Sequence, residues 1–131
     1  MHEENMAKVV FAVVDEGSRL GIMPFGAQYC FKVDKQDKFL IKFKHNDTQT
    51  LEEVYPYGVH TVNVSLHKNY DKAGLIPSVV QSGTIEFEVK EGFVTRITAY
   101  RPEVTKLSVA IGTPPKVKVD VTLFPEELYN S

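Results

Sequence analysis

The apolar residues of this chain recur at every second position over much of its length, and this alternation restricts the fold more than any other feature. Tyr29, Phe31 and Val33 follow it within residues 28–33. Successive side chains of a β-strand point to opposite faces, so such a segment predicts a strand with one buried face. The same period recurs in four further segments, which are residues 39–43, 60–66, 105–111 and 117–123.

Helical spacing is confined to single turns. No stretch of ten or more residues carries apolar side chains at intervals of three and four, so no long helix is expected. The segment "TLEE" has the spacing of a capping box between Thr50 and Glu53, and Pro56 would end the turn. The segment "PEELY", residues 125–129, places a proline and two glutamates where a helix begins.

Residues 82–100, "SGTIEFEVKEGFVTRITAY", contain two alternating runs joined at "KEG". A loop of residues 90–92 makes Phe87 face Thr95, and this register places the apolar residues of both runs on one face. Gly92 then takes the left-handed last position of a three-residue loop, which a residue without a Cβ adopts at no steric cost. The segment therefore predicts a β-hairpin.

With the apolar run "KVVFAVV" at residues 8–14, the chain has eight candidate strands. The first strand, apolar at nearly every position, is expected to be central or buried on both faces. The expected fold is an all-β, antiparallel two-sheet β-sandwich of about eight strands, with a closed β-barrel as the alternative. A chain of 131 residues without repeats or linkers predicts a single domain over residues 1–131.

Charge and cysteine content exclude several classes of partner. A net charge of −2 provides no field that would attract nucleic acid or anionic lipid. No apolar run approaches the roughly 20 residues of a membrane helix, and the single Cys30 excludes an internal disulfide. We therefore expect no nucleic-acid or membrane partner. The polar, acidic start of the chain predicts a cytoplasmic protein, or a secreted one whose signal peptide is absent from this chain.

Three long segments between predicted strands are candidate binding loops, because rigid β scaffolds usually carry their sites on connections. They are residues 15–27, 46–57 and 68–82. If successive strands alternate in direction, the first two loops emerge at the same end of the molecule. That end would gather Arg19, Met23, Phe25, Asp47, Glu52, Glu53, Tyr55 and Tyr57. Tyrosines there offer apolar area and a hydroxyl to a sugar or a protein partner, although the same rings also suit packing that closes the end of the sandwich.

The histidines do not predict a catalytic or metal site. His60 and His67 are seven residues apart, so on one straight strand they point to opposite faces. A zinc site needs three or four converging ligands, and we expect no metal, no cofactor and no catalytic residue. His60 lies on an apolar face, where a hydrogen-bonded structural histidine is the usual occupant, although a buried imidazole can also act as a base.

The sequence thus favours a non-enzymatic binding or self-assembly module that uses loops at the end of a β-sandwich. Its expected partner is a protein, a carbohydrate or a second copy of the chain. The predicted ligand-binding residues are Arg19, Phe25, Tyr55, Tyr57 and His60. The alternative is a small enzyme or small-ligand carrier with an inter-sheet pocket near His60, which an interior cavity would favour.

Overall fold

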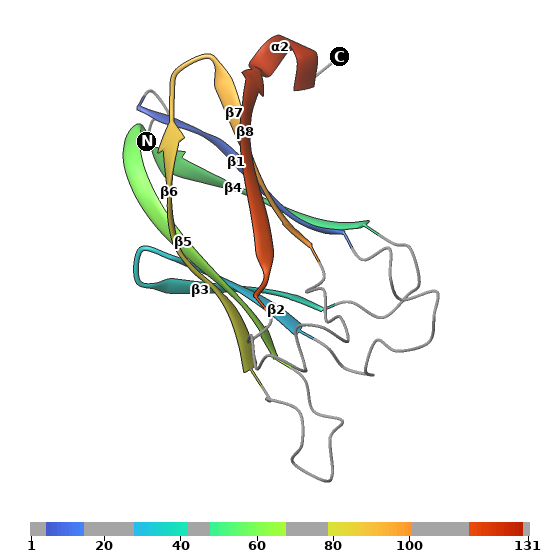
Figure 1. Ribbon diagram of the computed structural model, residues 1–131. Helices are drawn as coiled ribbons and strands as arrows, with labels where there is room; N and C mark the ends of the chain where they lie inside the picture. Colours follow the sequence, from blue (N-terminus) through green and yellow to red (C-terminus); the bar gives the residue numbers. More distant parts are fainter. Residues whose placement is uncertain (1–4, 15–27, 42–47, 68–78, 101–115, 130–131) are drawn as a thin grey trace, which may run out of the picture.

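The computed structural model of the protein describes residues 5–14, 28–41, 48–67, 79–100 and 116–129 (Figure 1). Nearly all of these residues lie in strands, so the all-β prediction is confirmed for this part of the chain. No helix among these residues is long and apolar enough to cross a membrane. The elements are β1 (Met6–Val14), β2 (Gln28–Val33), β3 (Gln36–Ile41), β4 (Thr48–Pro56), β5 (Gly58–His67), β6 (Val79–Val89), β7 (Phe93–Tyr100), β8 (Lys118–Pro125) and the short helix α2 (Glu126–Tyr129).

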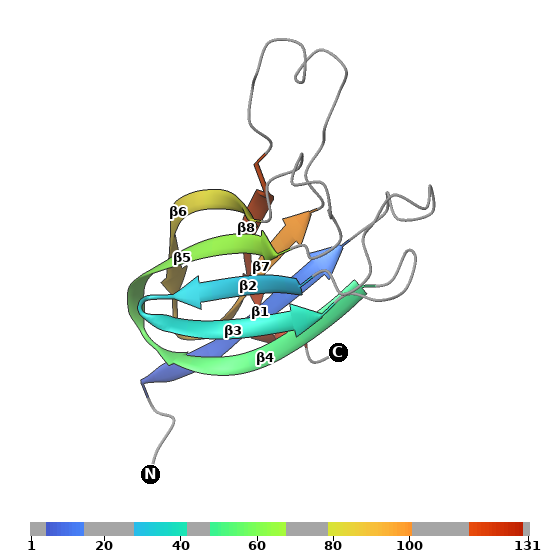
Figure 2. The same ribbon diagram turned by 90° about the horizontal axis from the view of Figure 1, so that it is seen from below.

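The strands form two sheets of four. The first sheet has the order β4, β1, β7, β8, and the second sheet has the order β3, β2, β5, β6. In Figure 2, β2 of the second sheet crosses over β1 of the first. The described strands make two separate sheets, so the closed barrel considered as an alternative is not formed.

β1 and β7 are parallel neighbours, with Phe11 beside Ile97, whereas the other strand pairs are antiparallel. The prediction of wholly antiparallel sheets is therefore wrong for this pair. The prediction of a central first strand is confirmed, because β1 lies between β4 and β7 and its residues from Val9 to Val13 are all buried. Burial on both faces is typical of strands that take a parallel neighbour.

The chain crosses from one sheet to the other at two short connections. Tyr57 alone joins β4 of the first sheet to β5 of the second, and residues 90–92 join β6 of the second sheet to β7 of the first. The three-residue loop is confirmed, and Gly92 has the expected positive φ, +80°. The predicted hairpin is wrong, because β6 pairs with β5 while β7 pairs with β1 and β8.

The reason for this error is that alternation identifies the buried face of a strand and not its hydrogen-bonded neighbour. Phe87 and Val89 of β6 and Ile97 of β7 do face one core, as predicted, but they approach it from opposite sheets. The same inward pattern fits two strands of one sheet and two strands packed face to face.

β4 replaces most of the loop predicted over residues 46–57 and the helical turn predicted from Thr50. The strand pairs antiparallel with β1, placing Glu53 beside Val9 and Leu51 beside Phe11. A polar residue at an inward position hid the strand, and pairing with β1 overrides the local capping signal, as tertiary context commonly does. The strand expected over 105–111 lies outside the described residues, as do the loop at 15–27 and most of the loop at 68–82.

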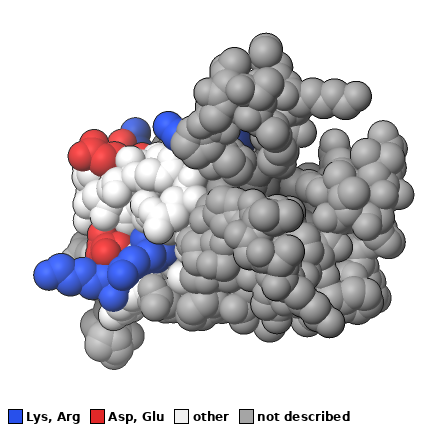
Figure 3. All heavy atoms as spheres, turned by 60° about the horizontal axis from the view of Figure 1, so that its bottom comes forward, with Lys and Arg blue, Asp and Glu red and all other residues white. Residues whose placement is uncertain are grey.

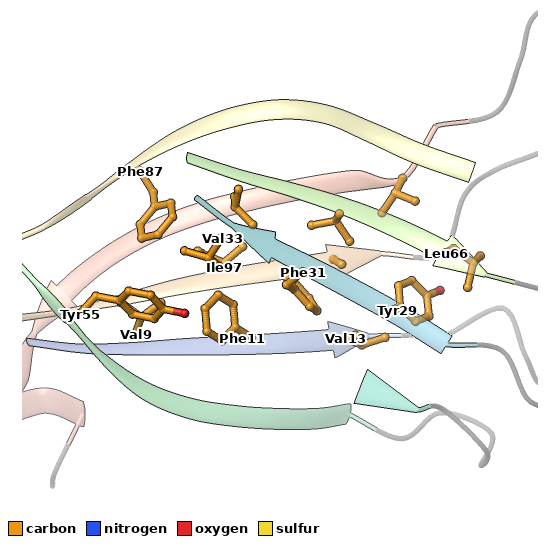
Figure 4. Packing of buried hydrophobic residues seen from close by; sticks show 14 of the residues in the cluster. Val9, Phe11, Val13, Tyr29, Phe31, Val33, Tyr55, Leu66, Phe87 and Ile97 are labelled. Atoms are coloured by element: carbon orange, nitrogen blue, oxygen red, sulfur yellow. The ribbon is translucent and has the colours of Figure 1, made fainter. Parts of the chain in front are cut away.

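The core lies between the inner faces of the two sheets (Figure 4). The rings of Phe11 from β1 and Phe31 from β2 are 5.3 Å apart between centroids. The ring of Tyr55 from β4 meets Phe11 in an edge-to-face arrangement, with centroids 6.1 Å apart. Fully buried aromatic and branched side chains from both sheets surround them. This cluster of buried side chains from both sheets is the core of the described structure.

One backbone hydrogen bond links the edges of the two sheets. The Val117 amide, directly before β8, donates to the carbonyl of Gln81 in β6 at 3.2 Å. β8 is an edge of the first sheet, and β6 is an edge of the second. The sheets are therefore tied together along one side as well as through the crossings.

The central position of Phe11 predicts that Phe11→Ala lowers the free energy of unfolding by about 3–5 kcal/mol, because it removes a buried ring and leaves a cavity. Urea unfolding followed by circular dichroism measures this change. Val59→Ala is the control, since Val59 is 65% exposed and its truncation is expected to change stability by less than about 0.5 kcal/mol. A loss below about 1.5 kcal/mol for Phe11→Ala would contradict the described core.

Candidate crossover cleft

The two short connections, Tyr57 and residues 90–92, lie at the same end of the molecule as the start of β1, and we call this the crossover end (Figure 1). The Tyr57 amide donates to the carbonyl of Asn5 at 2.9 Å, which joins the first crossing to the chain entering β1. The Glu126 amide donates to the carbonyl of Gly92, also at 2.9 Å, which joins the second crossing to α2. Four separate parts of the chain therefore meet here.

A cleft of about 410 Å³ opens at this end, and we call it the crossover cleft. Its lining combines apolar side chains, two aromatic rings, one cation and two carboxylates. The lining residues are Met6, Ala7, Lys8, Val54, Tyr57, Glu91, Gly92, Phe93, Val94 and Glu126. It adjoins a second depression lined by Gly92, Pro125, Glu126 and Glu127. A volume of this size falls in the range of small-ligand sites.

Lys8, the cation in this lining, is already engaged by neighbouring groups. Its Nζ lies 3.4 Å from Glu52 Oε1 and 4.8 Å from the centre of the Tyr129 ring. The Tyr129 hydroxyl donates to Glu52, and this hydrogen bond, followed by the charge of Lys8, lowers the pKa of Glu52. Within the described residues, Glu91 and Glu126 form no ion pair. The crossover cleft is therefore acidic.

Tyr57 lies half-buried between these carboxylates. Burial, and then the charges of Glu91 and Glu126, raise the pKa of the Tyr57 hydroxyl above its ordinary value. The hydroxyl consequently stays protonated at neutral pH and can donate a hydrogen bond. On the other side of the cleft, the Lys90 ammonium lies 5.3 Å from the centre of the Phe93 ring, so this ring already accepts a cation.

His60 lies beside the first crossing, at the edge of the core. Its Nδ1 is 2.9 Å from Asp34 Oδ2, and its Nε2 is 2.8 Å from the carbonyl oxygen of Pro56. The ring stacks on Phe87, with centroids 5.5 Å apart, and meets the Tyr55 ring in an edge-to-face arrangement, with centroids 5.7 Å apart. His60 is thus hydrogen-bonded at the rim of the core, the arrangement expected of a structural histidine.

Asp34 is held where its carboxylate receives two hydrogen bonds. It begins the two-residue turn between β2 and β3 with a φ of +54°, a conformation that Asp adopts more readily than most residues. Its Oδ1 accepts from the Thr61 amide at 3.2 Å, and its own amide donates to the Thr61 carbonyl at 2.9 Å. The hydrogen bond from His60 is the main cause of the lowered pKa of Asp34, and the Thr61 amide adds to it.

The pKa of His60 reflects opposing effects. Burial of the ring lowers it, but the hydrogen bonds to Asp34 and to the Pro56 carbonyl, together with the Asp34 charge, outweigh burial and raise the pKa of His60. The histidine and the aspartate therefore stabilise one another's charged forms.

Tyr55 points into the core rather than toward a ligand. Only 9% of it is exposed, and its buried hydroxyl finds no hydrogen-bond partner in the described structure. Burial, followed by the charges of Glu53 and Asp34, raises the pKa of Tyr55 to about 12. Its hydroxyl is therefore neutral at any ordinary pH.

The structure brings Tyr55, Tyr57 and His60 to the crossover end, whereas Arg19 and Phe25 lie outside the described residues. Tyr55 and His60 are in contact, and Tyr57 alone of the three lines the cleft. β4 carries Tyr55 to the end opposite Val14, which is paired with Thr48. The grouping of Arg19 and Phe25 with the tyrosines remains a prediction.

Sequence reasoning missed Asp34, Glu91 and Glu126. Asp34 lies in the turn between β2 and β3, and only the pairing of Val33 with Val62 shows that this turn reaches His60. Glu91 and Glu126 are 35 positions apart in the chain and meet through the bond between Glu126 and Gly92. The one sequence signal for this part of the cleft was Gly92, because a glycine in the left-handed position of a three-residue loop places the preceding Glu91 in that loop.

Away from the crossover cleft, charged side chains of both signs occur together. On the face shown in Figure 3, basic and acidic residues stand in small groups with uncharged surface between them. No cluster of three or more histidine, cysteine or acidic side chains suited to a metal occurs among the described residues.

The described strands define an all-β protein of two open sheets with an acidic cleft where the chain crosses between them. No protein-family model matches the sequence, and comparison with curated proteins and with solved structures finds no significant match. The function must therefore be inferred from the cleft and its surroundings.

The burial of the Tyr55 hydroxyl without a partner in the described structure can be tested by mutation. Tyr55→Phe is expected to leave the free energy of unfolding unchanged or to raise it by up to about 1 kcal/mol, because it removes a polar group buried without a partner. Tyr129→Phe is the matched control and is expected to lower stability, since that hydroxyl has an acceptor. A loss above about 1 kcal/mol for Tyr55→Phe in urea unfolding would show that its hydroxyl is bonded.

The contact between His60 and Asp34 predicts that the two residues contribute jointly to the free energy of unfolding, and that this coupling depends on pH. The raised pKa of His60 makes the ionic part of the coupling complete below the unfolded value of about 6.5, and this part is lost as pH rises through the folded value. The lowered pKa of Asp34 makes it complete above the unfolded value of about 3.9 and removes it as pH falls through the folded value. A double-mutant cycle of His60→Gln and Asp34→Asn should therefore give its largest coupling near pH 5, about 1 kcal/mol, since Asp34 is half-exposed. An equal coupling at about pH 9 would contradict the assignment.

Proposed function

We propose that this protein is a non-enzymatic binding module with a β-sandwich architecture, and that it binds a protein partner through the crossover cleft. The observation that carries the proposal is the acidic cleft of about 410 Å³, built from Tyr57, Glu91, Glu126 and the apolar residues beside them. Strands β1, β4 and β7 of the first sheet carry part of its lining, and the two short crossings and α2 carry the rest. Preformed sites bind with little reorganisation.

The chemistry of the lining favours the side chain of an arginine or lysine on the partner. Glu91 and Glu126 are the two carboxylates of the cleft lining and form no ion pair within the described residues, whereas Lys8 is neutralised by Glu52. A long basic side chain would place its methylene groups against Val54 and Phe93 and its charge against the carboxylates. The Tyr57 hydroxyl adds a donor for a carbonyl of the partner's backbone.

A carbohydrate partner is less well supported. A sugar platform requires an aromatic ring lying flat at the surface, but the Tyr55 ring is buried against Phe11 and His60 and Tyr57 is half-buried. Self-assembly also has less support, because the large apolar residues exposed in the described structure come from four different elements. They are Val54, Val59, Leu123 and Leu128.

The arrangement around His60 speaks against the small enzyme or carrier. Both ring nitrogens already have partners, and the rings of Phe87 and Tyr55 pack on the imidazole. His60 is not among the lining residues of the crossover cleft or of the depression beside it. A base requires a free nitrogen facing a substrate, and this histidine offers none.

The binding proposal is tested by titrating the protein with a short blocked peptide that contains one arginine, followed by amide chemical shifts. We expect shifts at Lys8, Tyr57 and Glu91, and a loss of affinity of about fivefold, roughly 1 kcal/mol, for the double variant Glu91→Gln with Glu126→Gln. Adding salt should weaken binding, because the ion pairs are exposed.

Two controls make this test specific. The same peptide with citrulline in place of arginine keeps the shape and removes the charge, and Glu86→Gln removes an exposed carboxylate from β6 without touching the cleft. Equal binding of the citrulline peptide, or shifts confined to another surface, would contradict the proposal.

A further inference from the structure

His60 lies between two hydrogen-bond acceptors. Nδ1 faces a carboxylate oxygen of Asp34 at 2.9 Å, and Nε2 faces the Pro56 carbonyl oxygen at 2.8 Å. Neither partner can donate, so both contacts are hydrogen bonds only if both ring nitrogens carry a proton. The geometry therefore fits the imidazolium form. A neutral ring has only one N–H, so one of its nitrogens would face an acceptor oxygen with a lone pair and without a proton.

The contact that a neutral ring loses is the one to Pro56. A hydrogen bond to a carboxylate is about twice as strong as one to a neutral carbonyl, so the remaining proton stays on Nδ1, facing Asp34. The lone pair of Nε2 then faces the Pro56 oxygen at a distance where the two repel. Deprotonation of His60 thus acts on the end of β4 and leaves the turn at Asp34 in place.

The Pro56 carbonyl belongs to the same planar peptide unit as the Tyr57 amide. That amide donates to the Asn5 carbonyl at 2.9 Å, while the carbonyl accepts from His60. This peptide of the first crossing is therefore held on both of its sides. Its orientation determines where the Tyr57 side chain enters the crossover cleft, so loss of the bond from His60 frees the plane to rotate and moves that ring.

Few charged or titratable groups surround His60, so the response of this region to pH is simple. Among the described residues, Asp34 faces the ring from the turn between β2 and β3, and Tyr55 faces it from β4. Phe87 covers it from β6 and carries no charge. Since Tyr55 is neutral throughout and Asp34 is ionised above acid pH, His60 is the group in this set that changes charge between weakly acid and weakly basic pH.

We propose that protonation of His60 regulates the crossover cleft, and we call His60 with its hydrogen bonds to Asp34 and Pro56 the clasp. The imidazolium holds the crossing peptide and Tyr57 in the binding arrangement, and the neutral ring releases them. The regulatory part rests on the proposed function, while the coupling between His60 and Tyr57 does not. Binding of a basic peptide then weakens as pH rises through the folded pKa of His60. Arginine stays charged throughout this range, and ordinary carboxylates titrate well below it.

The clasp is tested without any ligand by amide and imidazole nitrogen shifts recorded from about pH 5 to about pH 9. We expect both nitrogens of His60 to carry protons at the acid end, and Nε2 to lose its proton as pH rises while Nδ1 keeps its own. The signals of the Tyr57 and Gly58 amides should shift with the same apparent pKa. His60→Gln should remove this shift of both amides, and Asp34→Asn should move its midpoint to lower pH. A Tyr57 amide that does not follow the His60 titration in the unmodified protein overturns the proposal, whatever the stability of the variants.

The regulatory consequence is tested with the blocked arginine peptide at the same two pH extremes. Affinity should fall by about threefold from acid to basic pH in the unmodified protein, as expected for one backbone hydrogen bond coupled to the cleft, and should stay constant in His60→Gln. An unchanged affinity in the unmodified protein, or an equal fall in the variant, overturns the regulation. Absence of peptide binding at every pH contradicts the proposed function instead, while the shifts of Tyr57 still decide whether the clasp exists.

Discussion

The contact between the inner faces of the two sheets, centred on Phe11 and Phe31, is the interaction on which the rest of the structure depends. It requires β1 to be apolar on its inner face and determines which side of β2, β5 and β7 is buried. It also brings the ends of β4 and β5, and of β6 and β7, close enough for connections of one and three residues. The crossover cleft exists because these short connections meet beside the start of β1 and α2.

Much of this fold could be predicted from alternation alone. The inward faces of β2, β5, β6 and β7 follow the period of two, and the helical turn "EELY" follows from its proline and glutamates. Three features could not be predicted. The parallel pairing of β1 with β7, the separation of β6 from β7 and the existence of β4 all depend on which strands become neighbours. A side-chain pattern carries no information about the hydrogen-bonded partner of a strand when several strands bury equivalent faces.

The site was predictable to a smaller extent, for a related reason. The sequence indicated Tyr57 because a tyrosine in a loop offers apolar area and a hydroxyl, and His60 because an imidazole on an apolar face can act as a base. Both lie at the crossover end. Asp34 and Glu126 were not indicated, because their neighbours come from β5 and from the loop before β7. Local sequence identifies the kinds of side chain that can bind, but the electrostatics of a site comes from residues that only the tertiary structure brings together.

The hydrogen bond between Val117 and Gln81 has a consequence for the behaviour of the protein at high concentration. Unpaired edge strands are templates onto which another chain can add, and this route leads to aggregation. Here the edge of one sheet is joined to the edge of the other at the start of β8, and charged residues such as Lys118, Asp120 and Glu86 stand along the same two strands. This side of the molecule is thus shielded against the addition of foreign strands, even though neither sheet closes on itself.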